Sequence, residues 1–120
     1  MESNSSNQQP RLAKINGVFY FKQLESGNLV GEYFNTGMLE RGTESADIDS
    51  NSRQNPHVPF VGKYKSSWWD NDADGSDLEI KKFQTGFEIF ELTWTNKNKK
   101  IFEGIGMLCG DMLIGEYHQL

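Results

Sequence analysis

The segment Leu29-Val-Gly31-Glu-Tyr33 decides the fold, because its pattern returns twice, as Phe60-Val-Gly62-Lys-Tyr64 and Leu113-Ile-Gly115-Glu-Tyr117. Each copy has an apolar residue, any residue, glycine, any residue and tyrosine. Alternate residues of a β-strand share one face, so the apolar residue, the glycine and the tyrosine of each copy point the same way. This alternation of bulk and vacancy suits the inside of a small barrel, where glycine permits strong coiling and leaves space opposite a ring.

Short alternating segments on both sides of these copies, rich in Val, Ile, Phe, Tyr and Thr, predict further strands. Turn signals such as Ser26-Gly27-Asn28 and Cys109-Gly110-Asp111 separate them. The predicted strands lie near residues 14–22, 28–34, 37–43, 60–69, 77–83, 87–95, 100–108 and 111–118. About eight antiparallel strands predict an all-β fold, a small closed up-and-down β-barrel whose interior holds its own side chains or one small ligand. A two-sheet β-sandwich is the alternative.

Length and charge define the organisation and exclude several partners. A chain of 120 residues is one domain, in which we expect residues 1–12 to be a disordered polar tail and residues 13–120 to be the barrel with a long loop at 44–57. A net charge of −5 disfavours nucleic acid and anionic lipid, and no apolar run reaches membrane-spanning length. As it stands, the sequence predicts a cytoplasmic protein, or an exported or lipid-anchored one if a signal precedes this polar start.

Large aromatic residues at strand positions indicate what lines the interior. Strand parity with Gly62 and Tyr64 points Trp68 inward and Trp69 outward. The functional interpretation is a pocket for a small apolar or amphipathic ligand, with loop 44–57 as its lid, and the structural interpretation is ordinary core packing. The predicted pocket residues are Tyr33, Tyr64, Trp68, Trp94, Phe102 and Tyr117.

The glycine–aromatic strands resemble those of the avidin/streptavidin branch of the calycin-type barrels. The segments that carry the resemblance are Ile15-Asn-Gly17-Val-Phe19, Leu29–Tyr33, Glu91-Leu-Thr-Trp94-Thr-Asn-Lys-Asn98, Phe102-Glu-Gly104-Ile-Gly106 and Leu113–Tyr117. The resemblance implies a barrel with a central pocket, in which Tyr33 and Trp94 contact the ligand and Asn35 adds a small polar contact. Phe21 stands where that family has an asparagine that grips biotin, which argues against biotin as the occupant.

The motif Asp70-Asn-Asp72-Ala-Asp74-Gly75 has carboxylates at alternate positions before a glycine. Such a loop folds several oxygens around one hard cation, so it is a candidate calcium site that Asp77 or Glu79 would complete. The alternative is a plain polar turn, since Asp and Gly are the residues that turns use.

The sequence favours a binding protein over an enzyme and leaves catalysis open, because no catalytic acid–base pair or nucleophile stands out. The strand residues predicted to point outward, which include Val18, Val30 and Met107, are unusually apolar, and they predict a homo-oligomer if these side chains cluster. Two functions follow: a barrel with a ligand pocket, or a structural or protein-interaction domain with a filled core, stiffened by calcium and acting through its outer surface. The two functions differ in whether the inward-facing glycines leave a void inside the barrel.

Overall fold

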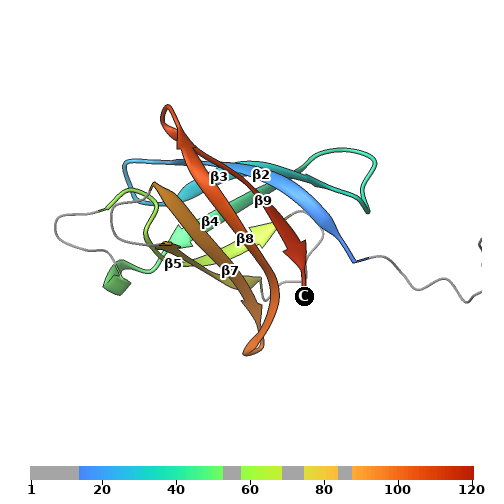
Figure 1. Cartoon of the computed structure of the whole chain (residues 1–120). Coiled ribbons are helices and arrows are strands. Elements are labelled where there is room, and N and C mark those ends of the chain that lie inside the picture. The colour runs from blue at the N-terminus through green and yellow to red at the C-terminus, as the bar shows by residue number, and fades with distance from the viewer. Residues whose placement is uncertain (1–13, 53–57, 69–74, 84–87) are drawn as a thin grey trace, which may run out of the picture.

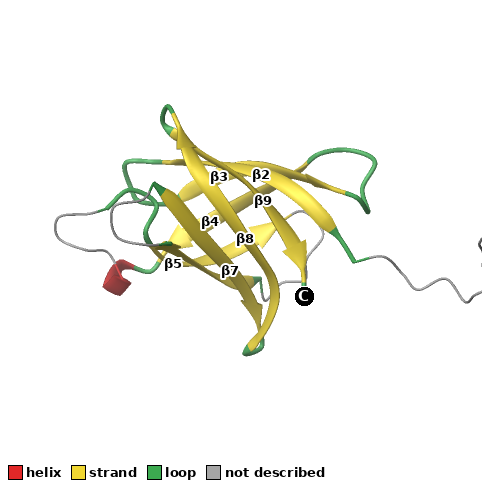
Figure 2. Cartoon of the chain, in the orientation of Figure 1, coloured by secondary structure: helices red, strands yellow, loops and turns green. Residues whose placement is uncertain are grey.

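The computed structural model describes residues 14–52, 58–68, 75–83 and 88–120. Within these residues the chain forms one closed antiparallel barrel in which each strand pairs with the next and β2 pairs with β9 to close the sheet (Figure 1). Figure 2 shows that strands dominate the described chain, with one short 3-10 turn at Ser50–Ser52. The strands are β2 (Asn16–Gln23), β3 (Leu29–Asn35), β4 (Gly42–Ile48), β5 (Gly62–Trp68), β6 (Ser76–Lys82), β7 (Ile89–Asn96), β8 (Lys99–Cys109) and β9 (Met112–Gln119). The predicted up-and-down barrel is confirmed and the sandwich alternative is wrong.

The third strand lies about five residues later in the chain than the sequence predicts. The prediction placed it near 37–43 and began a loop at residue 44, whereas β4 runs from Gly42 to Ile48. Leu39, which made the earlier segment look strand-like, is 98% exposed. The inward residues of β4 are Gly42, Glu44 and Ala46, which carry little hydrophobic signal, so the usual apolar alternation does not reveal this strand.

Two of the repeated tyrosines, Tyr33 and Tyr117, pack over glycines of neighbouring strands that lie outside the three copies of the repeat. Gly42 on β4 lies opposite Tyr33 on β3, and Gly17 on β2 lies opposite Tyr117 on β9. A Cβ atom added at Gly42 would lie 2.6 Å from Cζ of Tyr33, and one added at Gly17 would lie 2.5 Å from Cζ of Tyr117. Each tyrosine ring therefore covers a glycine of the neighbouring strand, and the glycine is the space that the ring occupies.

One end of the barrel is filled by apolar side chains and closed by a polar network. Gln23 accepts a hydrogen bond from the backbone N–H of Phe60 (2.7 Å) and donates one to the Tyr64 hydroxyl (3.1 Å). Tyr64 in turn donates to the carbonyl of Phe60 (2.7 Å). The fully buried apolar side chains of this end are Phe21, Leu29, Leu78, Ile80, Phe90, Leu92 and Leu113. This end holds the fully buried apolar side chains, and the opposite end holds the interior space described below.

In the described part of the chain, no helix has both the length and the apolar character needed to cross a bilayer.

Candidate functional site

A pocket of about 150 Å³ enters the barrel at the end opposite the apolar core. Its walls come from the start of β2, β4 and β8, the end of β3, β5, β7 and β9, and the turn between β3 and β4. The residues that line it are Ile15, Phe19, Tyr33, Asn35, Gly37, Met38, Glu44, Trp68, Trp94, Phe102 and Tyr117. Aromatic side chains occupy part of this end of the barrel and leave the pocket between them, so the interior is neither empty nor completely filled.

The aromatic wall is a connected cluster. The ring centroids of Trp94 and Tyr117 lie 5.7 Å apart, and those of Phe102 and Tyr117 lie 5.5 Å apart. Phe19 meets Trp94 edge to face at 6.0 Å, and Trp68 meets Phe102 in the same way at 6.4 Å. These separations are those of favourable aromatic pairs, so each ring supports the position of its neighbours.

Glu44 is the polar centre of the pocket. It is an inward residue of β4, 6% exposed, between Gly31 on β3 and Trp68 on β5. The Ser66 hydroxyl donates a hydrogen bond to its Oε2 atom (2.5 Å), and the Trp94 indole N–H donates a second one to the same atom (2.8 Å). In the described residues Oε1 receives no hydrogen bond, so this oxygen is the one left for a ligand.

Burial raises the pKa of Glu44 to about 7, because a charged carboxylate loses its hydration inside the barrel. The hydrogen bonds from Ser66 and Trp94 act in the opposite direction, since they favour the charged form. Over the described residues, no lysine, arginine or histidine makes an ion pair with this carboxylate. A buried carboxyl without a cationic partner is costly to the fold, which is typical of a functional site.

The structure brings six of the seven predicted pocket residues together. Tyr33, Asn35, Trp68, Trp94, Phe102 and Tyr117 all line the pocket. Asn35 also donates a hydrogen bond to the Tyr117 hydroxyl (2.9 Å) and accepts one from the backbone of Gly37 (2.8 Å), which fixes the rim. Tyr64 does not belong to this group, because it lies in the polar network at the other end of the barrel.

The described part of the predicted lid, residues 44–52, does not cover the pocket. Residues 44–48 of the predicted loop belong to strand β4. The described residues that follow β4 pack beside the start of β5, where the backbone N–H of Asp49 donates a hydrogen bond to the carbonyl of Lys63. That is the end closed by Tyr64. Among the described turns, the β3–β4 turn reaches the pocket and contributes Gly37 and Met38.

Sequence reasoning missed Glu44 and Ser66 as site residues. Glu44 falls at the start of the predicted loop 44–57, and Ser66 is a small polar residue between Tyr64 and Trp68 on the inward face of β5, where serine gives no signal of its own. A signal for Glu44 exists in the period-two pattern Gly42, Glu44, Ala46, Ile48, whose last member is β-branched and packs against the core.

The candidate calcium site falls mainly outside the described residues, where Asp70, Asp72, Asp74 and the predicted outward Trp69 lie. Asp77 is described, and its carboxylate faces outward and pairs with the amine of Lys65 at 2.6 Å. Elsewhere in the described ranges, no three His, Cys, Asp or Glu residues gather as metal ligands would.

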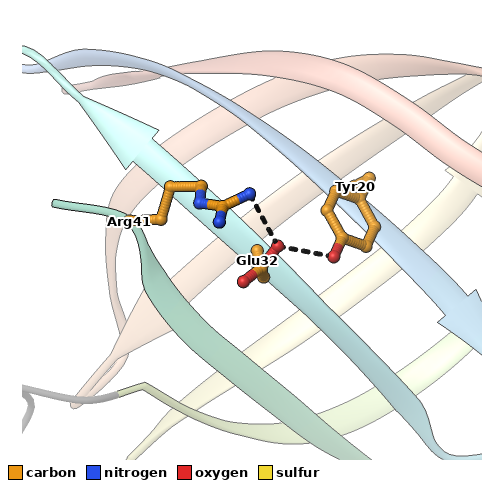
Figure 3. Close-up of polar contacts among 3 residues, drawn as sticks. All are labelled: Tyr20, Glu32 and Arg41. Atoms are coloured by element: carbon orange, nitrogen blue, oxygen red, sulfur yellow. Dashed lines mark hydrogen bonds and ion pairs between the residues drawn. The ribbon is translucent and has the colours of Figure 1, made fainter.

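A second, shallow hollow of about 210 Å³ lies on the outside of β2 and β3. Beside it, Glu32 accepts a hydrogen bond from the Tyr20 hydroxyl (2.6 Å) and pairs with Arg41 at 3.4 Å (Figure 3). The hydrogen bond to the Glu32 carboxylate raises the pKa of Tyr20, since removing the proton would set two negative charges together. Val18 and Phe34, 55% and 41% exposed, pair across the two strands next to this hollow. The outer face of this region is therefore apolar with a polar margin.

The fold and the pocket define a closed eight-stranded antiparallel barrel, compatible with a calycin-like barrel, that has space for a ligand at one end. No protein-family model matches the chain, and comparisons with curated proteins and with solved structures give no significant match either.

Proposed function

We propose that the protein is a non-enzymatic binding barrel that holds one small amphipathic ligand in the pocket around Glu44. The observation that carries the proposal is the contrast between the two ends of the barrel. One end is filled by fully buried apolar side chains, while the other keeps about 150 Å³ between aromatic rings and a carboxyl group. A few convergent polar groups in an otherwise apolar cavity are typical of ligand sites.

The volume limits the size of the ligand. A cavity of about 150 Å³ accommodates a molecule on the order of benzene in size. This supports a compact ligand and, together with Phe21 in the buried core in place of a polar residue, argues against biotin. The avidin-like resemblance therefore informs the proposal through the barrel and its aromatic pocket, and it carries no ligand with it.

Native mass spectrometry of protein purified without added ligand tests the proposal. We expect a co-purifying organic mass in the wild type that a Gly37→Leu variant loses, because the new side chain grows from the pocket wall. Thr43→Leu adds the same side chain to the exposed face of β4 and is expected to keep the mass. A bare wild-type protein that also binds no small probe in titration would contradict the proposal.

A second function, self-association, rests on a different observation. The outward residues Ile89, Met107 and Ile114 are register neighbours on β7, β8 and β9, which lie side by side in Figure 1. Met107 is 59% exposed, and the row carries no charge. We infer that a second copy of the chain covers this row, because a twofold axis would bring the same uncharged side chains together and remove them from water.

Sedimentation velocity tests this second function. We expect the wild type to sediment as a dimer and Met107→Glu as a folded monomer, since the variant would bury a carboxylate at the contact. Thr43→Glu adds the same charge elsewhere on the outside and is the matched control. A wild-type protein that sediments as a monomer at all concentrations would contradict self-association.

A further inference from the structure

The chemistry of the pocket wall is one-sided. Its lining includes one carboxyl group, Glu44, and none of the described residues that line it is lysine, arginine or histidine. The remainder is mainly aromatic, and the face of an aromatic ring carries negative electrostatic potential that attracts cations. Both kinds of group therefore favour positive charge in the same space.

We propose, building on the binding function above, that the ligand is a small organic cation whose charged head lies between the aromatic rings with Glu44 as its counter-ion. Oε1 of Glu44 is the contact atom, because both hydrogen bonds from the protein converge on Oε2. Ser66 and Trp94 hold the carboxylate in place for this contact. The ligand supplies the positive charge that the described residues do not.

The alternative ligand charges fit less well. An anion would meet the Glu44 carboxylate and no basic residue in the described wall, so it would lose hydration without a compensating ion pair. A neutral ligand of the same shape would fill the space and would leave the buried carboxylate without a counter-ion. The cation alone satisfies both the shape and the charge of the site.

The proposal implies a specific pH dependence. Strands β3, β5 and β7 carry the residues nearest Glu44, and their inward ionisable side chains are Tyr33 and Tyr64, while β9 adds Tyr117. Among the described residues no second carboxylate, amine or imidazole faces Glu44 from these strands, so its own ionisation controls the charge of the pocket. With a Glu44 pKa of about 7, a permanent cation should bind tightly above neutral pH and weakly below it.

Calorimetric titration with choline and with 3,3-dimethyl-1-butanol tests the proposal. Choline is a permanent cation that does not titrate, and the alcohol is its neutral isostere with carbon in place of nitrogen. From the ionised fraction of a group with pKa about 7, choline affinity is expected to fall about 30-fold between about pH 8 and about pH 5.5. The alcohol is expected to bind weakly and without this pH dependence.

Glu44→Gln keeps the size of the side chain and an oxygen that accepts from Ser66 and Trp94, and removes the charge. We expect the variant to lose at least tenfold in choline affinity at about pH 8 and to show no pH dependence. Glu25→Gln, in the exposed turn after β2, removes a charge far from the pocket and should leave the affinity unchanged.

The outcomes separate this proposal from the binding function. Equal affinity for choline and its neutral isostere, or unchanged choline affinity in Glu44→Gln, would overturn the cation proposal and leave a ligand-binding pocket. Absence of binding by both probes, with no co-purifying mass on the purified protein, would overturn the binding function itself.

Discussion

Replacing Glu44 by glutamine should change the pH dependence of stability in a way that no exposed substitution does. The pKa of Glu44 is about 7 in the folded protein and 4.5 is its ordinary value, a difference that corresponds to roughly 3 kcal/mol. Because the pKa is raised by folding, the folded state holds a proton that the unfolded state has already lost between these two values. The wild type should therefore become less stable as the pH rises from about 4.5 to about 7, and then level off.

Urea denaturation followed by tryptophan fluorescence measures this effect. Glu44→Gln has no titrating group at this position, so its free energy of unfolding minus that of the wild type should rise by roughly 3 kcal/mol between about pH 4.5 and about pH 8. Other titrating groups are common to both proteins and cancel in the difference. Glu25→Gln, the exposed control, should show no such trend. Parallel pH profiles for the wild type and Glu44→Gln would refute the buried-carboxyl argument.

Three further substitutions test the packing around the pocket. Ser66→Ala removes a hydrogen bond to the carboxylate, so it should raise the pKa of Glu44 further. The free energy of unfolding should fall by about 1 to 3 kcal/mol at about pH 8 and by less at about pH 5. Equal losses of stability at the two pH values, measured by denaturation, would contradict this. Gly42→Ala should displace the ring of Tyr33 and cost about 1 to 3 kcal/mol, seen by denaturation and near-ultraviolet circular dichroism, and an unchanged stability would count against the ring-over-glycine packing. Tyr64→Phe should cost about 1 kcal/mol while choline affinity stays constant, whereas a loss of affinity would place this tyrosine in the site.

Strand number and strand parity could be predicted because the sequence marks them twice, through turns and through the apolar–glycine–tyrosine repeat. Gly62, Tyr64 and Trp68 point inward together, as their alternate positions require. Gly42, which lies opposite Tyr33, is outside the repeat, so this pair is found only after the strands are placed in register. In strands with this repeat, local pattern therefore specifies which side chains enter the barrel.

The end of the barrel to which each inward residue belongs could not be predicted, because it depends on where each strand begins and ends and on its register with its neighbours. Tyr33 and Tyr64 occupy the same place in their repeats, yet the first lines the pocket and the second closes the opposite end. The inward position of Glu44 could not be predicted for a related reason. A carboxyl group in a polar segment looks solvent-exposed, and its burial depends on Ser66 and Trp94, which lie 22 and 50 residues away in sequence.

The most direct test is a pH titration of the Trp94 indole N–H signal by nuclear magnetic resonance, with and without choline. This N–H donates to the Glu44 carboxylate, so its chemical shift reports the ionisation of that group. We expect a midpoint of about pH 7 in the free protein, a lower midpoint with choline and no change with its neutral isostere, because a bound cation favours the charged carboxylate. The same midpoint with and without choline would contradict the account of a cation held against Glu44.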